Sequence, residues 1–127
     1  MMFVQGKIRN ILRLEGLCIL LAAVFFYRQI YGDWELFAWL FLVPDLAFLG
    51  YLISTGVGAF SYNCTHSMIG AFILLIFSMV VSNEVIMAVS LIWFAHVGFD
   101  RALGYGLKYG SSFHDTHLGK IGIKSNT

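Results

Sequence analysis

The fold class of this chain follows from Ser90–Tyr109, which reads SLIWFAHVGFDRALGYGLKY. The stretch is the end of an apolar helix that carries His96, Asp100 and Arg101 before the chain becomes polar. His96 and Asp100 are four residues apart, so they lie on one helix face about one turn apart. These three side chains are costly at the end of an apolar helix unless they face protein or water. The stretch therefore predicts a functional site near the end of a membrane-spanning helix.

The composition of the whole chain is that of an integral membrane protein. Of its 127 residues, 59% are hydrophobic and only 12% are charged, whereas a soluble domain is about 45–50% apolar and about 25% charged. At about 20 residues per spanning helix, the chain has room for four helices and a tail. We therefore expect an all-α integral membrane protein, with four transmembrane helices in a bundle and one domain over residues 1–127. The apolar runs place the helices at about 8–31, 34–54, 59–81 and 85–106, followed by a cytoplasmic tail over about 107–127.

Basic residues predict how the chain is oriented in the membrane. They gather before the first expected helix and after the last one, whereas the two turns on the other side carry mainly Asp33, Glu35 and Glu84. The positive-inside rule then places the N and C termini in the cytoplasm, as in a multi-pass protein of a bacterial inner membrane. Pro44 lies inside the second expected helix and predicts a kink there.

Polar side chains lie at a similar depth in all four expected helices. Counting residues from the helix ends places them at or below the bilayer midplane, on the cytoplasmic side. The outer half is almost wholly apolar, so we expect a buried polar pocket in the cytoplasmic half. Its candidate residues are Glu15, Asp45, Tyr62, Asn63, His66, His96, Asp100, Arg101 and Tyr105.

Four of these pocket residues form a candidate metal-ligand set. Two imidazoles and two carboxylates, from Asp45, His66, His96 and Asp100, suit a divalent transition metal such as zinc, iron or manganese. Each of the four also has a structural alternative, namely a hydrogen bond that fixes helix packing. Tyr62, Asn63 and Arg101 are candidates for supporting the ligands.

Three functions therefore remain open from the residues alone. The first is a metal-dependent membrane enzyme acting on lipid, since a bound metal can activate water for hydrolysis. The second is a non-catalytic membrane subunit or lipid-binding scaffold, and the third is a proton-coupled carrier. The expected partners are membrane lipid and either a second copy of the chain, as a homo-oligomer, or a larger membrane complex. A net charge of +1 gives no reason to expect nucleic acid.

Several motifs of the chain resemble those of a known family. They are Val43-Pro44-Asp45, Gly50-Tyr51, Gly58, Tyr62-Asn63, His66-Ser67, His96-x-x-x-Asp100-Arg101, Gly104–Tyr109 and Thr116–Gly119. Together they resemble an uncharacterised family of small four-helix bacterial membrane proteins, domain of unknown function 4260. The resemblance implies the four-helix architecture and that the polar residues belong to the family's pattern, without implying an activity.

A second resemblance concerns Pro44-Asp45 and Thr65-His66-Ser67. These are similar to segments of membrane-bound metal-dependent hydrolases, which pair an Asp-rich segment with a His-Arg and Thr-His-Ser segment. The chain departs from that pattern because Leu46 and Ala47 follow Asp45, where a second acid is wanted. It also has Tyr62-Asn63 in place of His-Arg.

Overall fold

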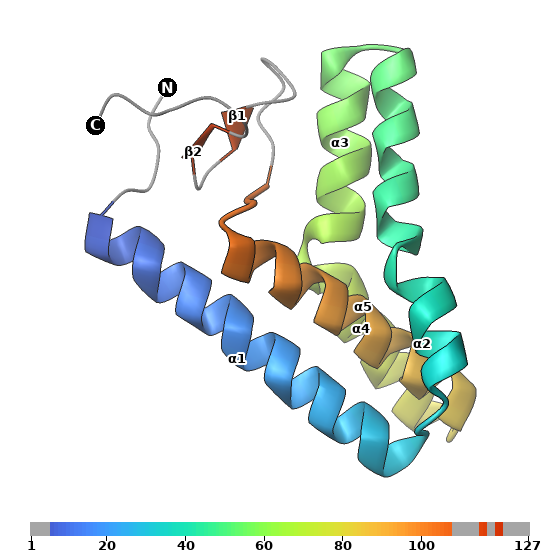
Figure 1. Cartoon of the computed structure of the whole chain (residues 1–127). Coiled ribbons are helices and arrows are strands. Elements are labelled where there is room, and N and C mark those ends of the chain that lie inside the picture. The colour runs from blue at the N-terminus through green and yellow to red at the C-terminus, as the bar shows by residue number, and fades with distance from the viewer. Residues whose placement is uncertain (1–5, 108–114, 117–118, 121–127) are drawn as a thin grey trace.

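A computed structural model of the chain describes residues 6–107, 115–116 and 119–120. The described part is helical except for one short antiparallel pair of two-residue strands (Figure 1). In chain order the elements are α1 (Gly6–Ile30), α2 (Trp34–Phe41), the 3-10 helix η1 (Val43–Leu52), α3 (Thr55–His66), α4 (Met68–Val80), α5 (Glu84–Leu103), β1 (Asp115–Thr116) and β2 (Gly119–Lys120). Most of the expected tail over 107–127 lies outside the described residues.

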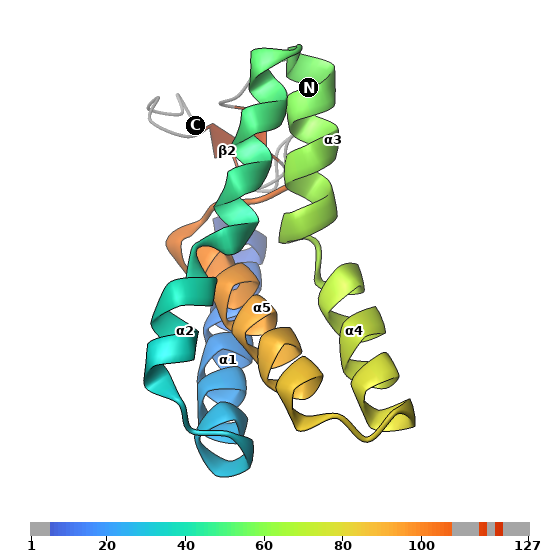
Figure 2. The ribbon, with the colours of Figure 1, turned by 90° about the vertical axis from the view of Figure 1, so that its right-hand side faces the viewer.

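Helix α5 is the centre of the fold. In its most apolar 18-residue window 61% of the residues are buried, against 17% in α1 and none in Trp34–Leu52. Helices α1, α2 and α4 surround it, and the hairpin of η1 and α3 projects beyond them (Figures 1 and 2). The helix that carries His96 and Asp100 is therefore held from several sides.

Helices α1 and α5 lie against each other through two glycines. A Cβ atom on Gly98 would lie 2.7 Å from the Gly16 carbonyl oxygen, and one on Gly16 would lie 2.9 Å from the Gly98 carbonyl oxygen. Small residues at such a crossing let two helix backbones approach closely, as in membrane helix pairs. Arg13 adds a hydrogen bond from its Nε to the Ala102 carbonyl oxygen at 2.9 Å, near the end of α5.

The expected second helix, over 34–54, is two helices of different type. Asp33 caps the start of α2, because its carboxylate accepts the backbone N–H of Glu35 and of Leu36. The α-helix ends at Phe41, and the chain continues from Val43 as the 3-10 helix η1 with Pro44 near its start. Proline has no N–H for the α-helical ladder and its ring clashes with the turn before it, so the predicted kink becomes a change of helix type.

The expected third helix, over 59–81, is also broken. Ser54 caps it early, by accepting the Val57 N–H at 3.0 Å, so α3 begins at Thr55. At Ser67 the backbone is extended, and the Ser67 hydroxyl caps the next helix, α4, by accepting the Ile69 N–H. The two halves are bent by 42°. A straight helix is therefore the wrong expectation here, since Ser67 both ends one helix and starts another.

The last helix, expected over 85–106, ends at Leu103. Gly104 has a left-handed backbone with φ of 94°, and its N–H and that of Tyr105 bond back to the carbonyls of Arg101 and Asp100. This is the usual glycine C-cap of an α-helix.

Three spans of the described chain are long and apolar enough to cross a membrane, namely α1, Trp34–Leu52 and α5. The bent pair α3–α4 makes a fourth if it counts as one span. These findings agree with the expected membrane protein in class, by helix length and composition.

Candidate metal centre

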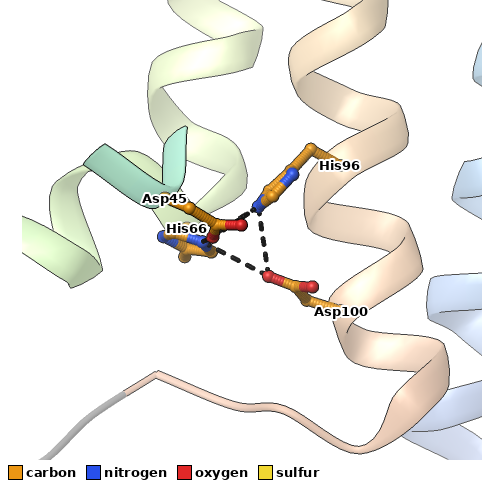
Figure 3. Close-up of side chains that lie close together, drawn as sticks. All are labelled: Asp45, His66, His96 and Asp100. Atoms are coloured by element: carbon orange, nitrogen blue, oxygen red, sulfur yellow. Dashed lines mark hydrogen bonds and ion pairs between the residues drawn. The ribbon is translucent and has the colours of Figure 1, made fainter. Parts of the chain in front are cut away.

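Four side chains from three elements meet where the two broken spans pass α5. Asp45 lies in the first turn of η1, directly after Pro44, and His66 is the last residue of α3. His96 and Asp100 lie one turn apart on the buried face of α5. Figure 3 shows all four pointing toward one another. The break at Ser67 directly follows His66, and the change of helix type at Leu42 lies three residues before Asp45.

The distances within this group are short and nearly equal. His66 Nε2 lies 3.0 Å from Asp45 Oδ1 and 3.2 Å from Asp100 Oδ2. His96 Nε2 lies 3.2 Å from each of the same two oxygens, and the two Nε2 atoms are 3.0 Å apart. Ligands of a tetrahedral zinc ion, at about 2.0–2.1 Å from the metal, are separated by about 3.3 Å. Five of the six distances among the four ligand atoms therefore have about the length of a tetrahedral edge, and all four residues offer ligand atoms within 4.8 Å of one another.

Hydrogen bonds alone do not account for these contacts. Each Nε2 atom faces two carboxylate oxygens and the other Nε2, yet one ring nitrogen carries at most one proton. With both carboxyl groups ionised, two protons at most are thus available for five short contacts. If both nitrogens were protonated, their N–H groups would oppose each other across 3.0 Å. A single cation between four lone-pair donors would satisfy all four at once.

The second nitrogen of His66 is held in the way expected of a metal ligand. Its Nδ1 lies 3.0 Å from the Tyr62 carbonyl oxygen and 2.9 Å from the Thr65 hydroxyl. In the tautomer protonated at Nδ1, this nitrogen donates to the carbonyl, which only accepts. This leaves the Nε2 lone pair for a metal, the arrangement that fixes the tautomer of many ligating histidines. The Tyr62 ring stacks on the His66 ring with centroids 3.8 Å apart. His96 packs edge-on against Phe41, and its buried Nδ1 has no hydrogen-bond partner among the described residues.

Burial separates Asp45 from the other three residues. The side chains of His66, His96 and Asp100 are 0%, 2% and 12% exposed, whereas that of Asp45 is 37% exposed. Two carboxylates so close together in a largely apolar surrounding are costly unless a positive charge compensates them. A divalent cation would supply that compensation, and the exposed side of the group is at Asp45.

The breaks beside the ligands are stabilised by α5. Because Ser67 is extended, the carbonyls at the end of α3 lack helical partners. Trp93 Nε1 donates to the Thr65 carbonyl oxygen at 2.5 Å, and Arg101 Nη2 donates to that of His66 at 2.8 Å. The Thr65 hydroxyl also lies 3.1 Å from the Pro44 carbonyl oxygen, which links η1 to α3. Trp93 and Thr65 are absent from the expected pocket, although the hydroxyl residues flanking His66 were a signal of a break.

The other expected pocket residues have different places. Tyr62 and Arg101 support the group through His66, and Tyr105 contributes its carbonyl oxygen, which accepts a bond from Arg101. Asn63 is half-buried on α3, where its carbonyl accepts the Ser67 N–H.

Glu15 is the exception among the expected pocket residues. It is exposed on α1, in a surface hollow that Cys18 and Met68 also line, and does not belong to the His/Asp group. The neighbouring Gly16 faces α5, and adjacent helix positions point about 100° apart, so Glu15 points away from the pocket.

These features define a class of protein, a helical and apolar chain with three to four candidate membrane spans and a buried His/Asp group that could hold a metal ion. The chain belongs to the family described as Domain of unknown function (DUF4260), whose model matches residues 9–121. This match confirms the resemblance carried by the motifs. No curated protein and no solved structure matches the chain.

Proposed function

We propose that this chain is a metal-dependent membrane enzyme that binds one divalent transition metal and hydrolyses a lipid. The ligands are Asp45, His66, His96 and Asp100. One observation carries the proposal, the convergence of four ligand atoms from η1, α3 and α5 within 4.8 Å of one another. Residues separated by up to 55 positions meet at one point, and each contributes a metal-ligating atom.

The four ligands limit which metal ions the site can bind. Two imidazoles with two carboxylates suit zinc, iron and manganese, and the absence of thiolate ligands in the group disfavours copper(I). Contacts of 3.0–3.2 Å between the ligand atoms favour a small tetrahedral ion. Zinc is therefore the first metal to test.

The exposed side of the group gives the proposed chemistry. All four side chains would hold the metal, with Asp45 on the exposed side of the group. A bound metal would supply activation of water, whose pKa it lowers to about 7. Asp45 Oδ1 faces the two histidines, so the second oxygen of this carboxylate would act as general base and take the proton from water. The water oxygen would bond to the ester carbon or phosphorus of the lipid, and Asp45 would return the proton to the leaving oxygen as its bond breaks.

A second candidate function rests on the number of ligands. Four protein ligands complete a tetrahedral shell, as in structural zinc sites, whereas catalytic zinc usually keeps one position open. Two ligands come from the η1–α3 hairpin and two from α5. A metal here would then clamp the hairpin to the central helix in a non-catalytic membrane subunit or lipid-binding scaffold.

Metal content is the first test. The intact chain, with an affinity tag free of histidine, is purified in mild detergent and measured by native mass spectrometry and elemental analysis. We expect about one zinc, iron or manganese ion per chain in the wild type and in Glu15→Gln, since Glu15 lies outside the group. His96→Ala should lose the metal. A metal-free wild type after incubation with all three metals would contradict the proposal.

The variant Asp45→Asn distinguishes the metal-dependent enzyme from a non-catalytic protein in which the metal only holds the hairpin to α5. An amide oxygen still binds a metal weakly but cannot act as a base. For the enzyme, we expect hydrolysis of phospholipid vesicles to fall about 10²–10⁴-fold while metal remains bound. For the non-catalytic protein, the wild type hydrolyses nothing, and the variant changes only metal affinity and stability.

The proposed location is a bacterial inner membrane with both termini in the cytoplasm. The asymmetry of basic residues in the sequence supports it. A reporter fused after Thr127 should then be active only in its cytoplasmic form. A proton-coupled carrier would instead show flux driven by a pH gradient in liposomes, which the enzyme should not.

A further inference from the structure

We propose that a groove between the two broken spans binds the hydrocarbon chain of a membrane lipid and leads it to the metal centre. The groove has a volume of about 260 Å³. It is lined by residues of α2, η1, α3, α4 and α5. In Figure 2, α2 and α4 lie on opposite sides of α5, and the groove lies among these three helices.

The groove is lined by residues of several elements. Val89, Ile92 and Trp93 of α5 form its floor, while Leu40 of α2 and Leu74 of α4 also line it. Pro44 and Thr65 line it as well, and the Thr65 hydroxyl lies 3.1 Å from the Pro44 carbonyl oxygen. The lining is thus apolar apart from a hydroxyl that already has backbone partners.

The part of the groove lined by Pro44 and Thr65 adjoins the candidate metal centre. Pro44 and Thr65 each precede a proposed ligand by one residue, namely Asp45 and His66. On the floor, Ile92 lies one helical turn before His96, on the same face of α5. A chain lying in the groove would therefore bring its polar end next to the residues that precede Asp45 and His66.

The surface around the groove identifies its occupant as lipid. At the rim, Val43 is 45% exposed, and the apolar surface continues over Leu42, 62% exposed, and Leu46, 63% exposed. This surface belongs to Trp34–Leu52, one of the spans long and apolar enough to cross a membrane. A groove continuous with such a face is open to hydrocarbon rather than to water. An apolar cavity of about 150 Å³ already binds benzene, so this larger groove has room for a segment of an acyl chain.

This inference rests on the proposed function in one respect, because it names the substrate class of the proposed enzyme. The substrate is a lipid with a long hydrocarbon chain in the groove and its ester or phosphoester at the metal. Binding of the chain itself does not need the metal.

The test uses the intact protein in lipid nanodiscs that contain a phosphatidylglycerol with a photoactivatable diazirine in its acyl chain. After illumination, labelled residues are mapped by mass spectrometry, and metal content is measured on the same sample. We expect labels on groove residues such as Leu40, Leu74 and Val89. Val89→Trp fills the floor of the groove and should reduce this labelling about tenfold. A tenfold loss of binding corresponds to the hydrophobic free energy of burying about two methylene groups. Leu74→Trp fills the groove from the opposite element and should do the same.

The matched control is Ile73→Trp, which adds the same ring on α4 at a residue that is 64% exposed and outside the groove. It should leave the groove labelling unchanged. Ile73 is 64% exposed and should itself be labelled by the surrounding lipid, so it serves as the internal reference. Labelling of Leu40 relative to Ile73 that does not fall in Val89→Trp and Leu74→Trp would overturn the inference, and so would cross-links from groove residues to a second copy of the chain. His96→Ala distinguishes the two proposals, since it should lose the metal and keep the labels. Labels in a wild type that binds no metal would refute the proposed function alone.

Discussion

Gly98→Ala tests the packing that places the metal centre. The added Cβ would lie 2.7 Å from both the Gly16 carbonyl oxygen and the Leu20 backbone nitrogen, where ordinary contact begins at 3.4 Å. Both neighbours are backbone atoms of α1, so no side chain can move aside. These contacts must therefore lengthen by at least 0.3 Å to reach 3.0 Å, and by 0.7 Å to reach ordinary contact.

The size of the effect follows from two opposing terms. Alanine is favoured over glycine in a helix by about 1 kcal/mol, whereas overpacking costs about 1–3 kcal/mol and more where the backbone must shift. We expect a net loss of about 1–2 kcal/mol in the free energy of unfolding. Gly56→Ala is the control, because its Cβ meets only the Ser54 hydroxyl, at 3.8 Å. That variant should be neutral or stabilised by up to about 1 kcal/mol.

The displacement should also reach the metal. His96 and Asp100 each lie two residues from Gly98 on α5, and ligand distances are held to about 0.2 Å in a working metal site. The assay is denaturant unfolding in detergent micelles, with metal affinity measured by competition with a chelating dye. If Gly98→Ala unfolds like Gly56→Ala and binds metal like the wild type, then α1 and α5 do not pack as described and the reasoning fails.

Three further predictions concern the break in the α3–α4 span and the η1–α3 hairpin that precedes it. Arg101→Met should lower the free energy of unfolding by about 2–3 kcal/mol, because it leaves the His66 carbonyl oxygen without its charged donor. A loss below about 0.5 kcal/mol, measured by denaturant unfolding, would mean that this hydrogen bond contributes little. Trp93→Phe removes the N–H that bonds to the Thr65 carbonyl oxygen and should cost about 0.5–1.5 kcal/mol, with Trp39→Phe as the control at a 76% exposed position. Removal of bound metal with a chelator should increase protease cleavage in the loop between η1 and α3 at least several-fold. The reason is that Asp45 and His66, two of the four proposed ligands, lie on this hairpin and would connect it to α5 through the metal. Equal cleavage with and without metal would show that the metal does not hold the hairpin.

The sequence determined the class of the protein and the identity of the candidate ligands. Apolar runs of spanning length depend only on local composition, and the structure has such spans. The four proposed ligands were found because ionisable side chains are rare in apolar helices and are expected to face one another. The structure brings those four residues within 4.8 Å.

Only the tertiary structure decided where the spans break and which polar residues stay outside the group. Pro44 predicted a kink, but the break at Ser67 depends on donors from α5, Trp93 and Arg101, that satisfy the carbonyls left free. Those donors are 28 and 35 residues away along the chain, so no local pattern identifies them. Glu15 matched the others in depth but faces outward, because the rotation of α1 is set by its glycine contact with α5. Depth along a helix follows from counting residues, whereas the direction in which a side chain points depends on the partner that the helix packs against.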